Sequence, residues 1–171
     1  RRALTGDQRS VLLRSFNTRP LPIVLQTAVQ VAMSIPSFYK GGAVDSPSKA
    51  LLELIHTRAE YPCRGRVDLD RVWKVLEYVA VTPFGMQEEE LRALLAGGSQ
   101  TGKGPCPWMM WAEVRLVIEP LVMELFVDGV IVLCFRHEVY KAVILDERLG
   151  KFEDYRKVVK EVQVEPRLPH V

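Results

Sequence analysis

The sequence predicts a mainly α-helical fold with a single short β-strand or hairpin near residue 130. Hydrophobic residues make up 48% of the 171 positions and charged residues 26%, a composition typical of a globular protein and unlike that of a disordered chain. Apolar residues recur at three- and four-residue spacings along most of the chain, which is the period of a helix with one buried face. Val130 to Phe135 is instead an unbroken, β-rich apolar run that follows the turn dipeptide Asp128-Gly129.

Residues 1–66 are expected to form a small helical domain. Thr5 and Gln8 have the spacing of a capping box, and the apolar stripe after them predicts a helix over residues 6–16. An apolar segment over residues 21–35 opens with prolines, which the first turn of a helix tolerates. It predicts a second helix that is buried on most sides.

A turn separates the third helix of this domain from the first helix of the next. Ser46 and Pro47 are residue types favoured at the N-cap and first position of a helix, and they predict a helix that ends near Tyr61. Apolar residues between Leu69 and Ala80 recur with helical spacing. They predict a core helix over residues 68–81.

Residues 67–150 are expected to form a winged-helix-like domain, because three predicted helices are followed by a strand. Pro120 is expected to bend the third of these helices, and the strand is expected to be buried. Residues 151–171 are expected to form a C-terminal helix and a tail that lead to the next module. The predicted elements after the helix at 68–81 are a short helix over 86–95, a loop over 96–107, a long helix over 109–126, a strand over 130–135, and helices over 137–145 and 151–162.

Charge, cysteine content and hydropathy limit the classes of function. The 23 basic and 21 acidic residues give a net charge of +2, which is too balanced to indicate nucleic acid or an anionic membrane as the partner. Three widely spaced cysteines argue against a disulfide framework and favour a reducing compartment. No signal peptide and no apolar stretch long enough to cross a membrane is evident, so no membrane insertion is expected. The chain begins without methionine, which we interpret as a fragment of a larger protein.

Residues 97–104 are close to a phosphate-binding P-loop, except that glycine replaces the hydroxyl residue that binds magnesium. Such a loop must leave a strand and open a helix whose N–H groups face the phosphates. Here a predicted helix precedes the segment, and Pro105 and Pro107 follow it, so we interpret it as a solvent loop. The chain therefore has no Walker motif and is not expected to be an enzyme. The spacing of its cysteines and histidines also indicates no metal site.

The third helix predicted for the winged-helix-like domain is acidic. In a winged helix this element often enters the major groove of DNA, where contacts to phosphate need Lys and Arg. Residues 109–126 contain Glu113, Glu119 and Glu124 against Arg115, a net charge of −2. Nucleic-acid binding is therefore disfavoured, and packing against protein is expected.

His137 stands where the predicted strand ends and a helix begins. A side chain at such a junction either caps the helix or presents an N–H group to an anion bound at the helix N-terminus. The residues alone leave both roles open and favour capping.

Three segments follow one another in a characteristic order: LTGDQRSVLLRSFNTRPLPIVLQTAVQVA, then VWKVLEYVAVTPFGMQEEELRALL, then IEPLVMELFVDGVIVLCFRHEVYKAV. This order resembles the region downstream of the nucleotide-binding core in NACHT-type STAND ATPases. The nearest branch is that of the telomerase-associated and nephrocystin-like proteins. The resemblance covers about residues 4–150.

The resemblance implies a switch, gated by ADP or ATP, in which a helical domain and a winged helix close over the nucleotide. In that family a proline at the start of a helix packs near the adenine, and Pro22, or else Pro20, matches it. A histidine at the end of a winged-helix strand contacts the β-phosphate of ADP, and His137 matches it, although the usual histidine–aspartate pair reads His137-Glu138 here. No cofactor is expected in this chain alone, and the nucleotide would bind together with an upstream domain.

The leading hypothesis is a non-catalytic regulatory and protein-interaction module of a STAND-type scaffold protein. Its partners would be other domains of the same polypeptide and the proteins of a larger assembly. One alternative is a purely structural component of a large assembly, such as a ciliary or microtubule-associated complex. Another is a winged-helix nucleic-acid binder. A cytoplasmic location is expected and, more narrowly, a ciliary or cytoskeletal one.

Overall fold

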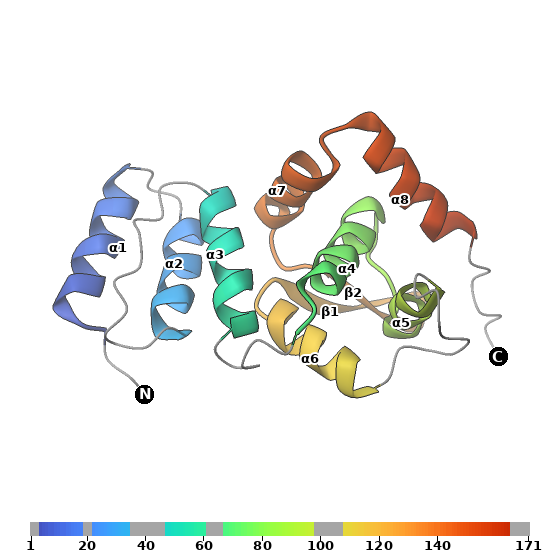
Figure 1. Ribbon diagram of the computed structural model, residues 1–171, viewed down its shortest axis with the longest axis horizontal. Helices are drawn as coiled ribbons and strands as arrows, with labels where there is room; N and C mark the ends of the chain where they lie inside the picture. The colour runs from blue at the N-terminus through green and yellow to red at the C-terminus, as the bar shows by residue number, and fades with distance from the viewer. Residues whose placement is uncertain (1–3, 19–21, 35–46, 61–66, 98–107, 165–171) are drawn as a thin grey trace. The chain divides into compact units, whose positions relative to one another are not determined.

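The computed structural model describes residues 4–18, 22–34, 47–60, 67–97 and 108–164. Contacts divide the chain into two compact units, Arg1–Val67 and Asp68–Val171. This boundary lies one residue from the one expected between positions 66 and 67. The described residues form helices and one two-stranded antiparallel sheet, so the predicted mainly α-helical class with a short hairpin is confirmed (Figure 1).

The first unit is built from the helices α1 (Gly6–Thr18), α2 (Pro22–Ser34) and α3 (Pro47–Glu60). α2 packs against both α1 and α3. The core between them consists mainly of small apolar side chains, which let helices approach closely. Its buried residues are Leu12, Val24, Ala28, Ala32 and Ala50.

The capping box predicted at the start of α1 is confirmed. The backbone N–H of Thr5 donates to Oε1 of Gln8 at 3.1 Å, and the N–H of Gln8 donates to Oγ1 of Thr5 at 3.3 Å. Two backbone donors that a helix start leaves without intrahelical partners are thereby satisfied. The side-chain amide of Gln8 also donates to the carbonyl of Ala32 at 3.5 Å, which connects α1 to α2. Ser46, the predicted N-cap of α3, lies outside the described residues.

The second unit is organised around α4 (Leu69–Val81). This helix contacts α5, α6, α7, α8 and β2 and lies in the middle of the unit in Figure 1. Val72 and Leu76 on it have no exposed surface. Asp68 caps its start, because Oδ1 accepts a hydrogen bond from the N–H of Asp70 at 3.1 Å. The other elements are α5 (Glu88–Gly97), α6 (Trp108–Ile118), β1 (Val122–Val127), β2 (Val130–Phe135), α7 (Glu138–Leu149) and α8 (Phe152–Val164).

β1 and β2 form an antiparallel hairpin that turns at Asp128-Gly129, as the sequence predicts. Both turn residues have positive φ, 48° and 87°, which is the backbone conformation of a two-residue hairpin turn. At the base of the hairpin Val122 pairs with Phe135, and both side chains are buried. The base of the hairpin therefore belongs to the core of the second unit.

Met86, between α4 and α5, pairs with β2 through an isolated antiparallel bridge to Leu133. Its N–H donates to the carbonyl of Leu133 at 3.0 Å, and its carbonyl accepts from the N–H of Leu133 at 2.8 Å. Gly85 permits this approach, since its φ is +89° and a Cβ there would lie 2.3 Å from the Leu133 carbonyl oxygen. The second unit is winged-helix-like. The helices α4, α5 and α6 are followed by the hairpin, and Met86, between α4 and α5, bridges to β2.

The prediction of one long helix over residues 109–126 is wrong. α6 ends at Ile118, and residues 122–127 form β1. Pro120 ends the helix instead of bending it, because proline donates no backbone hydrogen bond and its ring clashes with the preceding turn. The chain leaves the helix in a turn in which the N–H of Leu121 donates to the carbonyl of Ile118 at 2.8 Å.

Three other predictions need smaller corrections. The strand predicted over residues 130–135 is β2, but it is not buried throughout, because Ile131 near the turn is 58% exposed. α5 begins at Glu88 and not at residue 86, since Met86 is paired in the sheet. α7 continues to Leu149, beyond its predicted end at residue 145.

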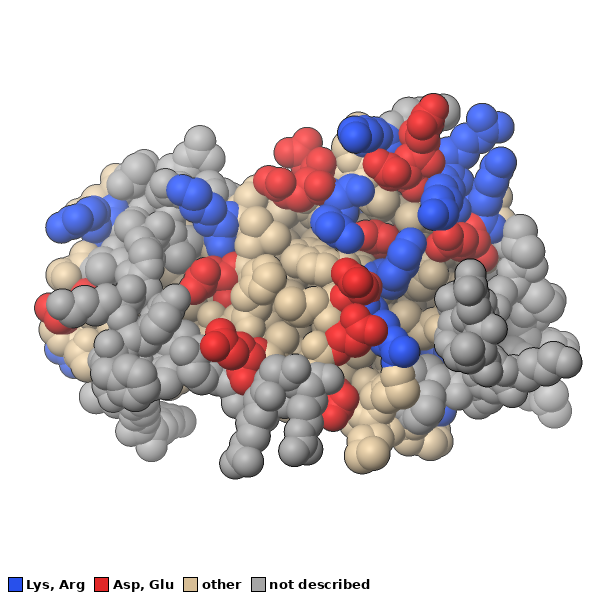
Figure 2. Space-filling view, in the orientation of Figure 1, with Lys and Arg blue, Asp and Glu red and all other residues tan. Residues whose placement is uncertain are grey.

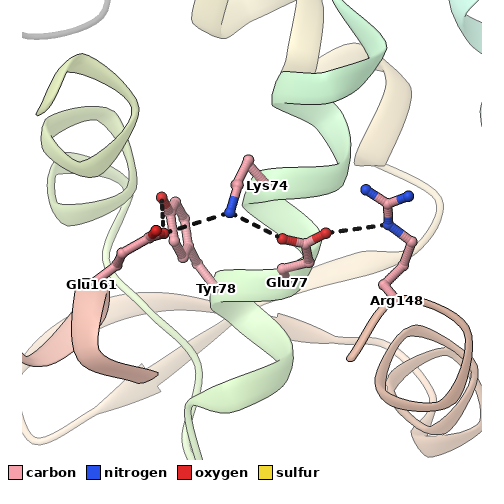
Figure 3. Close-up of polar contacts among 5 residues, drawn as sticks. All are labelled: Lys74, Glu77, Tyr78, Arg148 and Glu161. Carbon is pink, nitrogen blue, oxygen red and sulfur yellow. Dashed lines mark hydrogen bonds and ion pairs between the residues drawn. The ribbon is translucent and has the colours of Figure 1, made fainter. Parts of the chain in front are cut away.

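A polar network fastens α7 and α8 to α4 (Figure 3). Glu77 of α4 forms ion pairs with Arg148 of α7 at 3.2 Å and with Lys74 at 3.4 Å. Glu161 of α8 lies 3.5 Å from the same Lys74 and accepts a hydrogen bond from the hydroxyl of Tyr78 at 3.1 Å. The predicted C-terminal helix therefore packs within the second unit. The tail predicted after it lies outside the described residues.

Candidate functional site

His137 is the N-cap of α7 and lies two residues after Phe135, the last residue of β2. Its backbone is extended, and its Nδ1 atom accepts a hydrogen bond from the N–H of Val139 at 3.1 Å. Its ring lies edge-on to that of Tyr140, with the centroids 6.3 Å apart. Because Nδ1 accepts, the proton of the neutral imidazole is on Nε2, which is then a hydrogen-bond donor. The structure thus shows the capping role of His137, and its role in anion binding stays a prediction.

The residues beside His137 join the hairpin to the start of α7. Nη2 of Arg136 donates to the carbonyl of Val122 at 3.1 Å, across the base of the hairpin. Glu138 lies in the first turn of α7, where the helix dipole favours a negative charge. Burial and, to a smaller extent, the charge of Glu138 raise the pKa of the Cys134 thiol above its ordinary value of 9.0.

The two prolines matched by the resemblance are in the first part of the chain. Pro22 is the exposed first residue of α2, the helix-start position that the resemblance requires. Pro20, the other match, lies outside the described residues. Pro22 belongs to the first unit and His137 to the second. A nucleotide pocket lined by both stays a prediction.

The described residues add no support for a P-loop, a metal site or a membrane-spanning helix. Of the segment close to a P-loop only Gly97 is described, as the last residue of α5, and residues 98–104 lie outside the described part. Within the described ranges, no three His, Cys, Asp or Glu side chains converge as a metal site requires. Among the helices that the structure describes, none is both long and apolar enough to span a bilayer.

The second unit has an unusual surface on α6. One side of this helix is buried in the unit and packs against α4. The buried residues are Trp111, Val114, Val117 and Ile118. The opposite side is exposed and apolar: Trp108 is 64% exposed, Met109 76% and Leu116 42%, with the exposed Ala112 between them. Exposed helix positions normally carry polar side chains, so this side is a candidate binding surface.

The charge of α6 differs from the prediction. The net charge of −2 expected over residues 109–126 included residues that lie beyond the helix. α6 itself has one acidic residue, Glu113, and one basic residue, Arg115. Nη2 of Arg115 is paired with Oε1 of Glu124 on β1 at 2.8 Å. Neither α6 nor β1 therefore has an excess of positive charge for phosphate contacts.

Trp108 is exposed and yet held in place. The guanidinium carbon of Arg92 lies 3.5 Å from the centroid of the Trp108 ring. Arg92 comes from α5 and is itself buried, with 7% of its surface exposed. Stacking of a cation on an aromatic face is attractive and limits the rotation of the ring. The first residue of α6 is thus presented to solvent in a defined orientation.

The end of the hairpin also carries exposed apolar side chains. Phe126 and Ile131 pair across the two strands and are 73% and 58% exposed. Glu124 lies two residues before Phe126 and so projects from the same face of β1. The ion pair between Glu124 and Arg115 shows that this face is turned toward α6. We call the set Trp108, Met109, Ala112, Leu116, Phe126 and Ile131 the α6–hairpin surface.

Charged side chains of the second unit are distributed unevenly (Figure 2). On the face shown, they gather over α7 and α8 at the upper right. The lower edge, where Figure 1 draws the first turns of α6, is largely uncharged. The apolar side of α6 is therefore set apart from the charged helices of its own unit.

No family model, curated protein or solved structure matches the chain. The resemblance to NACHT-type STAND ATPases therefore stays a prediction, and function is argued from the chain's own residues.

The sequence did not predict the α6–hairpin surface, because residues 122–126 were assigned to the helix over 109–126. A signal for the hairpin was present in the turn. A two-residue Asp128-Gly129 turn sets the register of the two strands and places Phe126 opposite Ile131. Two apolar residues next to such a turn lie at the end of a hairpin, where burial is least.

Proposed function

We propose that the chain is a non-catalytic regulatory module whose second unit binds protein through the α6–hairpin surface. The observation that carries the proposal is the outward side of α6. It has Trp108, Met109 and Leu116 where a nucleic-acid-binding helix would present Lys and Arg to phosphates and bases. Large apolar side chains gathered on one exposed side of a helix are typical of sites of protein interaction.

We further propose that the module belongs to a NACHT-type nucleotide switch and works in the cytoplasm. Its partners would be other domains of the same polypeptide and the proteins of a larger assembly. Two observations support this setting: a helical unit precedes a winged-helix-like unit, and His137 stands at the junction of β2 and α7. The cap bond at Nδ1 makes Nε2 a donor, which is the group that an anionic phosphate would accept from. ADP or ATP would be bound together with an upstream domain.

Site-specific cross-linking tests the protein-binding function. A photo-reactive amino acid is placed at Met109 in the complete polypeptide, and in a control protein at the exposed Tyr155 of α8. Cross-linked protein is expected from position 109 and not from position 155. Phe126→Glu, on the hairpin, should remove the cross-link, because a charge there would have to be buried in the interface.

Two results would contradict this function. One is equal cross-linking from both positions, which would show that the α6–hairpin surface is not selective. The other is binding of duplex DNA that weakens steeply as salt is added, which would favour the nucleic-acid alternative.

Two substitutions of His137 test the nucleotide switch. Asparagine is a good N-cap and keeps the start of α7, whereas alanine removes both the cap and the imidazole. In the complete polypeptide both His137→Asn and His137→Ala should weaken ADP binding by about tenfold or more, since a hydrogen bond to a charged group is lost. Only His137→Ala should also lower the free energy of unfolding. Unchanged ADP affinity in His137→Asn would instead favour the purely structural alternative.

A further inference from the structure

We infer that the α6–hairpin surface binds an amphipathic helix of a partner protein, whose apolar stripe is flanked by Lys and Arg. The inference rests on the protein-binding function proposed above and adds the chemistry of the partner. Trp108, Ala112 and Leu116 stand at positions i, i+4 and i+8 of α6 and form an exposed ridge about 12 Å long. The apolar stripe of a second helix packs against such a ridge.

The hairpin adds to this ridge from the side. Arg115, next to Leu116 in the chain, is paired with Glu124 of β1, so the face of β1 that carries Glu124 is turned toward α6. Phe126 projects from the same face about 7 Å farther along the strand, and Ile131 is its partner on β2. A partner helix that lies along α6 and reaches the hairpin would meet apolar side chains from both elements.

The charges around the surface select a basic partner. Residues 108–131 contain four acidic side chains and one basic side chain. The acidic residues are Glu113, Glu119, Glu124 and Asp128. The basic one, Arg115, is already paired with Glu124. Arg92 of α5, which stacks on Trp108, is a second cation at this surface, but it is only 7% exposed. Lys and Arg beside the apolar stripe of a partner are attracted to these carboxylates, whereas an acidic helix or the phosphates of DNA are repelled.

Trp108 is suited to be the centre of the contact. Tryptophan is among the residues that most often dominate binding energy at protein interfaces. The stack on Arg92 already restricts the ring in the unbound protein. Less conformational entropy is then lost when a partner covers it.

A synthetic helix is the probe for the experiment. It is a fluorescein-labelled peptide of about 18 residues with leucines at helical spacing and lysines beside them, and its control has glutamates in place of the lysines. Fluorescence anisotropy measures binding to the 171-residue chain. Circular dichroism measures the helix that the peptide gains. The lysine peptide should bind at least about tenfold more tightly than the glutamate peptide at low salt and should become helical.

Variants of the chain locate the binding site. Met109→Glu should weaken the lysine peptide by at least about tenfold, since it places a charge in the apolar contact. Leu13→Glu is the matched control, because Leu13 of α1 is also apolar and 62% exposed but lies in the first unit, and it should change nothing. The double variant Glu113→Lys with Glu119→Lys should reverse the preference between the two peptides.

Several results would overturn the inference. These are equal affinity for the two peptides, an equal loss of binding in Leu13→Glu, or binding without a gain of helix. Concentration-dependent dimerisation that Met109→Glu abolishes would assign the surface to a second copy of the chain. If the lysine peptide fails to bind while cross-linking at Met109 persists, the proposed protein-binding function stands and only the basic helical partner is excluded.

Discussion

Oε1 of Glu77 lies 3.2 Å from Nε of Arg148, and Oε2 of the same carboxylate lies 3.4 Å from Nζ of Lys74. The Glu77 side chain is 6% exposed, whereas both cations reach solvent. A carboxylate so deeply buried is tolerated only while a cation remains beside it. The two cations are therefore expected to act as substitutes for one another.

This arrangement predicts non-additive stability. Lys74→Met or Arg148→Met alone should lower the free energy of unfolding by about 1 kcal/mol or less, because the other cation remains and both are partly exposed. The double variant should lose about 1–3 kcal/mol more than the sum of the single losses. Urea unfolding of the four proteins measures this coupling. Lys157→Met on the exposed side of α8 is the control, and a strictly additive double variant would contradict the account.

Gly85 is predicted to be irreplaceable for the bridge between Met86 and Leu133. Gly85→Ala should lower the free energy of unfolding by at least about 2 kcal/mol, because it strains a left-handed backbone and also pushes Cβ into the Leu133 carbonyl. Gly129→Ala is a matched control with φ of +87° and no atom within 4 Å of the added Cβ. Gly129→Ala should lower the free energy of unfolding by only about 1 kcal/mol, because it strains the left-handed backbone without a steric clash. Equal losses in thermal or urea unfolding would refute the steric argument.

The Cys134 thiol is predicted to react slowly in the folded protein. Burial and Glu138 raise its pKa above 9.0, so less of it is the reactive thiolate at pH 8 than in the unfolded chain. In a protein with Cys63 and Cys106 replaced by serine, iodoacetamide should alkylate Cys134 more slowly in the folded state than in the urea-unfolded state. Glu138→Gln should make the alkylation of folded Cys134 faster. The folded protein also binds more protons than the unfolded one near and above pH 9, so the free energy of unfolding should fall as pH rises there. A stability that increases in that range would contradict the shift.

The capping box of α1 is predicted to stabilise the first unit. Thr5→Ala removes the acceptor for the N–H of Gln8 and should lower the free energy of unfolding by about 1 kcal/mol. Ser10→Ala, in the same helix, removes an exposed hydroxyl that donates to the nearby carbonyl of Asp7 at 2.8 Å, and should have little effect. Urea unfolding followed by circular dichroism compares the two. A larger loss in Ser10→Ala would show that the cap is not what holds the helix start.

Sequence reasoning succeeded where the deciding contacts are local. The start of α1 depends on a bond between Thr5 and Gln8, three residues apart, and the hairpin turn depends on the conformations of Asp128 and Gly129. The position of His137 at a strand–helix junction was also predictable. Capping was one of two roles that the residues left open for it, and the hydrogen bond from the N–H of Val139 shows that His137 has this role.

The sequence by itself determined that this protein is mainly helical, where most helices begin and where the chain turns back as a hairpin. Only the tertiary structure decided that residues 122–127 are a strand, that Glu77 is buried between two cations, and that the apolar side of α6 is exposed. The physical reason is how far apart in the sequence the interacting residues lie. A helix satisfies its backbone with residues four positions away, whereas β1 needs β2, Glu77 needs α7, and the exposure of α6 depends on every element packed around it.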